Sequence, residues 1–103
     1  MRHYRTEPEY QAHVIETLKK MFPGSLVKKI EAPPQGIPDV WIFHTSGKSA
    51  FLECKRSKDE PHRPNQDLYV ERYNKQGAFA SFIFPENEEE VLNDLQRALE
   101  SGR

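Results

Sequence analysis

The stretches GIPDVWIF, residues 36–43, and AFLECK, residues 50–55, decide the fold. Both are apolar enough to form β-strands, and the residues TSGK at 45–48 between them favour a tight turn. Side chains two apart on a strand point to the same face, so Glu53 and Lys55 project together. Folding the hairpin brings Asp39 opposite residues 53–55. Two carboxylates and an ammonium would then share a small volume, and such oxygen ligands suit Mg²⁺.

The length of the hairpin loop determines whether the two acids share a face. A two-residue turn at Ser46-Gly47 would pair Asp39 with Cys54, and Glu53 would then lie on the other face. A loop of three or five residues, or a bulge near Asp39, would bring both carboxylates to the same side. We therefore expect one of these irregularities.

Length and composition indicate one soluble globular domain spanning residues 1–103, with 36% hydrophobic and 30% charged residues. No apolar run is long enough for a transmembrane helix or a signal peptide, so we expect a cytoplasmic protein with no membrane partner. The single cysteine, Cys54, excludes an internal disulfide, and four scattered histidines do not suggest a zinc site.

The distribution of charge is more informative than the net charge of −1, which gives no general attraction to nucleic acid. The basic residues gather at Lys19-Lys20, at Lys28-Lys29 and at residues 55–58, followed by Arg63, whereas four of the acids lie in 86–90. Each basic cluster can be an ordinary solvated surface.

The rest of the chain alternates between helical and strand patterns. A capping box of Thr6 and Glu9 predicts a helix that begins near Glu7 and ends at Pro23-Gly24. The further elements are an edge strand at 25–31, a loop at 32–36, a substrate-facing loop at 57–65, a helix at 66–76, a strand at 78–84 and a helix at 86–100. The order αβββαβα, with a crossover helix before the last strand, predicts an α/β fold with a mixed sheet flanked by helices.

The two central strands are nearly continuous apolar runs, which is typical of strands covered on both faces. Trp41 and Phe51 are therefore expected in the core rather than as aromatic platforms for a substrate. His44, which begins the turn, is expected to be exposed.

The chain resembles the PD-(D/E)xK nuclease superfamily, whose members have the restriction-endonuclease-like fold, through Pro38-Asp39 and Glu53-Cys54-Lys55 across a hairpin. Within it, the chain is most similar to VRR-NUC domains, and it also resembles archaeal-type Holliday junction resolvases. VRR-NUC domains occur alone in phage and bacterial proteins and at the end of larger DNA-repair nucleases. The matching positions are Glu7, Tyr10 and Gln11 in the first helix, Gly36-Ile37-Pro38-Asp39, and Gln66 at the start of the next helix.

This resemblance implies a Mg²⁺-dependent DNA endonuclease, with Mn²⁺ as a substitute, that cuts branched DNA such as Holliday junctions as a homodimer. Asp39 and Glu53 would bind the metal directly, and the backbone carbonyl of Cys54 would add a third contact. Glu7 would bind through water or position a second ion. The resemblance further implies that Lys55 orients or helps to deprotonate the attacking water, and that Gln66 holds the nucleophile or a phosphate oxygen. The candidates for contacts with the DNA backbone around the site are Lys28, Lys29, Arg56, Lys58 and Arg63. No helix carries a recognisable set of base-reading residues, so sequence-specific cleavage is not implied.

Other interpretations of the same residues remain open. Asp39 could cap a turn, Glu53 and Lys55 could pair on an exposed strand, and Glu7 could compensate the helix dipole, which the pattern alone favours. The apolar flanks of Asp39 and Glu53 argue against the first two, because unpaired buried charges are costly. The alternative functions are a nicking, flap or exonuclease component of a recombination or repair assembly, and an inactive DNA-binding module of the same fold.

Overall fold

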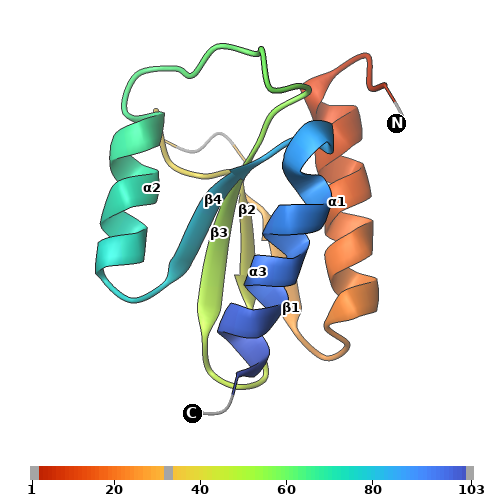
Figure 1. Cartoon of the computed structure of the whole chain (residues 1–103), viewed down its shortest axis with the longest axis vertical. Coiled ribbons are helices and arrows are strands. Elements are labelled where there is room, and N and C mark those ends of the chain that lie inside the picture. Colours follow the sequence, from red (N-terminus) through yellow and green to blue (C-terminus); the bar gives the residue numbers. More distant parts are fainter. Residues whose placement is uncertain (1–2, 32–33, 102–103) are drawn as a thin grey trace.

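A computed structural model describes residues 3–31 and 34–101, and its elements follow the predicted order (Figure 1). The helices are α1 (Glu7–Met21), α2 (Gln66–Lys75) and α3 (Glu88–Glu100), with a short 3₁₀ helix η1 (Pro85–Asn87) before α3. The strands are β1 (Leu26–Lys29), β2 (Val40–Phe43), β3 (Ser49–Cys54) and β4 (Phe79–Ile83). Ala32 and Pro33 of the predicted loop lie outside the described residues. Within the described part of the chain, no helix is long and apolar enough to cross a membrane.

The four strands form one mixed sheet in the order β1-β2-β3-β4. β1 and β2, and likewise β2 and β3, pair in antiparallel fashion, whereas β3 and β4 are parallel. A parallel pair needs a crossover connection, and α2 provides it. The predicted mixed sheet, its crossover helix and the edge position of β1 are therefore confirmed.

The main core lies between one face of the sheet and the helices α1 and α3, which Figure 1 shows on the same side of it. α1 begins with the predicted capping box, in which the Thr6 hydroxyl accepts from the Glu9 amide and the Glu9 carboxylate accepts from the Thr6 amide. The fully buried side chains of this core include Val14 and Leu18 of α1, Val40 and Ile42 of β2, Leu52 of β3, and Leu95 and Leu99 of α3. Burying them supplies most of the energy that holds the site's elements together.

The opposite face of the sheet is covered only in part, which corrects the expectation that the central strands are buried on both sides. α2 lies over β4 and β3, where Tyr73 stacks on Phe51 with ring centroids 4.4 Å apart. Trp41 and Phe51 are half-buried rather than in the main core, and Phe43 is 42% exposed. The short helix α2 does not extend across β2 and β1, so the aromatic side chains there are left at the surface.

His44 is also not the exposed residue that the sequence suggested, because its side chain is only 10% exposed. The turn folds back toward the ends of α1 and α3. There the imidazole packs edge-on against Phe22, with centroids 5.4 Å apart, and its Nε2 lies 3.8 Å from Glu100 Oε2. His44 Nδ1 also lies 2.9 Å from Ser46 Oγ, which keeps the ring in the turn.

Candidate active site

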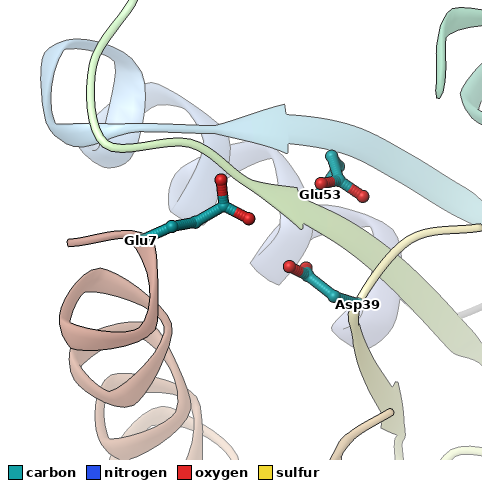
Figure 2. A group of neighbouring side chains, drawn as sticks. All are labelled: Glu7, Asp39 and Glu53. Atoms are coloured by element: carbon teal, nitrogen blue, oxygen red, sulfur yellow. The ribbon is translucent and has the colours of Figure 1, made fainter. Parts of the chain in front are cut away.

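Three carboxyl groups meet at one end of the sheet. Oxygen atoms of Glu7, Asp39 and Glu53 lie within 4.8 Å of one another, and Figure 2 shows the three side chains directed toward a common space. Glu7 comes from the first turn of α1, Asp39 from the residue before β2, and Glu53 from the end of β3. Asp39 is 7% exposed and Glu53 4%, while Glu7 is half-buried. The structure thus brings together three side chains that are far apart in the sequence.

The register of the hairpin explains how the two strand acids come to share a face. Val40 pairs with Leu52, so one step further along the strands Asp39 stands opposite Glu53. Residues 44–48 separate the last paired positions, so the connection is a five-residue loop, one of the alternatives that the sequence left open. Directly opposite residues point to the same side of a sheet. The expectation that an odd-length loop aligns these acids is confirmed.

Burial and mutual repulsion make the three carboxyl groups hard to ionise. Burial raises the pKa of Glu53 to about 8, and the neighbouring charge of Asp39 contributes in the same direction. The pKa of Asp39 is likewise raised, chiefly by burial. The positive charge of Lys55 opposes both effects without cancelling them. A group of carboxyl groups in this state is poised to bind a cation, because a cation would stabilise their ionised form.

Neutral hydrogen-bond donors hold the two strand acids in place. Gln66, 6% exposed at the first position of α2, donates from Nε2 to Glu53 Oε2 over 3.0 Å. The Cys54 amide donates to Asp39 Oδ1 over 3.2 Å, and Gln11 Nε2 donates to Asp39 Oδ2. The sequence indicated that Gln66 would lie near this site. It included Gln11 only as a motif position, without a role.

Lys55 lies beside the acids but is held by a loop rather than by an ion pair. Its side chain is almost completely buried, with 1% of the residue exposed, and its ammonium donates to the carbonyl of Pro61 over 3.1 Å. The ion pairs found among the described residues involve other groups. The buried ammonium therefore keeps donor capacity for a further partner, since it has three N–H bonds.

A fourth carboxyl group, Glu60, was not foreseen from the sequence. Burial raises the pKa of Glu7 to about 7, and a hydrogen bond to Glu60 adds to this effect. A hydrogen bond between two carboxyl groups requires a proton on one of them, and the raised pKa of Glu7 together with the lowered pKa of Glu60 favours Glu7 as the donor while that proton is bound. Glu60 Oε1 in turn accepts from the Arg56 amide over 2.6 Å. Glu60 lies in a loop without periodicity, 53 positions from Glu7, so no pattern could reveal the contact.

Cys54 is completely buried, and this burial raises the pKa of its thiol well above the usual range. A thiol in such surroundings stays protonated and is a poor nucleophile. Its contribution to the site is the backbone amide that binds Asp39.

The carboxyl groups open onto a cavity of about 520 Å³, whose wall includes Glu7, Asp39 and Glu53 as well as Lys29 and Arg63. Lys29 and Arg63 would attract a phosphate group, and the three carboxyl groups would attract a metal ion. Gln11 and Gln66 line the same cavity.

The other basic candidates do not line this cavity. Lys28 is exposed and, as the neighbour of Lys29 on β1, points to the opposite face of the sheet. The guanidinium of Arg56 donates to the carbonyl of Arg5 over 2.9 Å, and Lys58 is exposed on the loop after β3. Of the five predicted backbone contacts, Lys29 and Arg63 are thus the two in the wall of the cavity.

Comparison with known proteins supports the fold. No family model matches the sequence, and no curated protein matches it either. One solved structure, described as a VRR_NUC domain, superposes with a TM-score of 0.68 at 24% sequence identity. The match covers 84% of this chain and 94% of the other. The predicted restriction-endonuclease-like architecture and the resemblance to VRR-NUC domains are confirmed at the level of structure: this chain has the fold of a VRR_NUC domain.

Proposed function

We propose that this protein is a divalent-metal-dependent nuclease that hydrolyses phosphodiester bonds in DNA. The observation that carries this proposal is the meeting of Glu7, Asp39 and Glu53 beside a buried lysine, in a cavity whose wall also holds Lys29 and Arg63. Carboxylate oxygens suit a hard cation, whereas lysine and arginine suit phosphate. The name of the structural neighbour, a VRR_NUC domain, indicates the same class of activity.

Asp39 and Glu53 would bind Mg²⁺ directly, with Mn²⁺ as a substitute, and Glu7 would bind through water or hold a second ion. The donor set fits, because these oxygens cluster without a protein cation paired to them among the described residues. The backbone carbonyl of Cys54 would add a contact, since the amide and carbonyl of a residue in an antiparallel pair face the same neighbour, and the amide points to Asp39. When bound, the ion would supply Lewis acidity to the phosphate and lower the pKa of a water molecule.

The remaining side chains have roles that follow from their contacts. Lys55 has donor capacity beyond its bond to Pro61, and it would orient the attacking water and offset negative charge on the phosphate. Gln66 would hold Glu53 in the orientation that the site requires, or bind a phosphate oxygen. Lys29 and Arg63 would fix the DNA backbone at the cavity without reading the base sequence.

We further propose branched DNA, such as a Holliday junction, as the substrate, and a homodimer as the active form. One small domain offers little surface for a junction, and a two-fold pair presents two equivalent sites for two strands. Leu26 and Phe43, paired across β1 and β2, are 61% and 42% exposed on the partly covered face and are candidates for the contact between copies.

A cleavage assay tests the function and separates the alternatives. Labelled four-way junction, flap, linear duplex and single-stranded DNA would be incubated with the protein in Mg²⁺ or in EDTA. We expect paired, symmetric cuts in the junction that disappear with EDTA and with Asp39→Asn. Asp59→Asn is the matched control, because Asp59 is an exposed loop acid outside the cluster, and it should leave cleavage unchanged.

The other outcomes are equally specific. Cuts at flaps or ends alone would retain the nuclease chemistry and assign the protein to a nicking, flap or exonuclease activity in a larger assembly. Binding of DNA without cleavage of any substrate would overturn the nuclease proposal and leave a DNA-binding module of the same fold.

A further inference from the structure

Gln11 is a buried amide in the wall of the candidate active site. It lies on α1 four residues after Glu7, and residues four apart share a face of a helix, so both side chains are directed to the same side. Gln11 is 7% exposed and lines the cavity together with the three acids. A buried amide offers two donors and an acceptor, so each end needs a partner.

Only one end of the amide has its partner within the described protein. Nε2 donates to Asp39 Oδ2, but the buried Oε1 accepts no hydrogen bond from any described residue. Leaving a buried acceptor without a donor costs stability, so such an atom calls for an explanation.

Turning the amide around does not resolve the problem. In the reversed orientation Oε1 would face Asp39 Oδ2, and two acceptors would oppose each other once Asp39 is ionised by a bound cation, while the buried Nε2 would take the position without a partner. Asp39 therefore fixes which end is the oxygen. The nearby carboxylates of Asp39 and Glu53 are acceptors when ionised, so neither can serve Oε1 once a cation is bound.

We propose that Gln11 is a positioning residue for the divalent cation: its Oε1 accepts a hydrogen bond from a water molecule bound to that cation, while its Nε2 holds Asp39. This inference rests on the proposed metal-dependent function. Mg²⁺ keeps several of its waters when only a few carboxylates bind it, and those waters need acceptors in the surrounding protein. Gln11 thus joins Asp39 to the hydration shell of the ion through one side chain.

Calorimetric titration of the DNA-free protein with Mg²⁺ and Mn²⁺ tests this role without using activity. Gln11→Met keeps the length of the side chain and removes both polar ends. It should weaken cation binding by about 10–100-fold, as expected for the loss of a residue that orients bound ligands. An unchanged dissociation constant for Gln11→Met would overturn the proposal.

A second variant separates the two ends of the amide. Gln11→Glu keeps an acceptor for the water but loses the donor to Asp39. Gln35→Glu is its control, because Gln35 is an exposed residue in the wall of the same cavity and receives the same added charge. Gln11→Glu should bind the cation at least as tightly as Gln35→Glu. If Gln11→Glu instead binds as weakly as Gln11→Met, Gln11 acts only by holding Asp39, and the proposed contact with water is refuted.

Thermal unfolding without metal shows that the variants fold, and the increase in Tm on adding the cation gives a second measure of affinity. The wild-type titration distinguishes this inference from the proposed function. If the wild-type protein binds no divalent cation, both fail. If it binds one and Gln11→Met binds it equally well, only the role of Gln11 fails.

Discussion

Replacing Glu53 by glutamine tests how the candidate site stores electrostatic free energy. The substitution keeps the size of the side chain, and the new carbonyl can still accept from Gln66 Nε2, as Glu53 Oε2 does. What it removes is a carboxyl group with a pKa of about 8, compared with 4.5 for an ordinary glutamate. The stability of the metal-free protein should therefore respond to pH differently in the variant.

The direction in which stability changes with pH follows from proton binding. Between the unfolded pKa near 4.5 and the folded pKa near 8, the folded protein keeps a proton on Glu53 that the unfolded chain has lost. The free energy of unfolding consequently falls as pH rises through this window and is highest below it. The full difference between the two pKa values corresponds to about 5 kcal/mol. Solvent at the cavity and coupling to Asp39 reduce this to about 3 kcal/mol for the single site.

Urea denaturation in EDTA at several pH values between 5 and 9 measures this effect. Glu53→Gln should match the wild-type protein near pH 5 and exceed its stability by about 3 kcal/mol at pH 9. Glu16→Gln, at an exposed position of α1 outside the cluster, is the control and should follow the wild type. Equal pH dependence in Glu53→Gln and wild type would refute the reasoning. Adding Mg²⁺ at high pH should stabilise the wild type more than the variant.

Two further predictions concern the scaffold and the cavity wall. Gly36 and Gly47 both have positive φ, but a Cβ at Gly36 would lie 2.6 Å from Asn65 Cβ, whereas one at Gly47 would meet nothing within 4 Å. In urea denaturation, Gly47→Ala should lower the free energy of unfolding by about 1 kcal/mol, and Gly36→Ala should lower it by about 1–3 kcal/mol more. Equal losses in the two variants would show that the contact with Asn65 is unimportant. Lys29→Ala and Arg63→Ala should each weaken DNA binding in EDTA. Each should also make the negative slope of the log of the binding constant against log salt less steep by about 0.9, and an unchanged slope would place the DNA elsewhere.

Much of the fold could be predicted because it depends on short-range patterns. The capping box of α1 and the period-two pattern of the hairpin are local, and the required loop parity followed from the positions of Asp39 and Glu53. The same period also implies that Lys28 and Lys29 point to opposite faces, so the sequence alone indicates that at most one of them faces the candidate site.

The contacts that were missed join segments that no local pattern connects. Glu60 meets Glu7 through the path of an irregular loop, and the ammonium of Lys55 is held by a backbone carbonyl of the same loop. How far α2 extends across the sheet also could not be predicted from the sequence. An apolar strand such as β2 shows only that its side chains tolerate burial, whereas the covering helix decides which of them are buried.

The choice of partners around the acids indicates what the site is built to hold. The donors that fix Asp39 and Glu53 are two amide side chains and a backbone N–H, all of them neutral. Such donors orient a carboxylate but leave its charge largely in place, whereas an arginine would cancel it. The nearby Lys55 is directed to Pro61 instead of forming an ion pair. A structure selected for stability alone would pair these buried acids with cationic side chains, so their raised pKa values are the stability cost expected of the cation site proposed above.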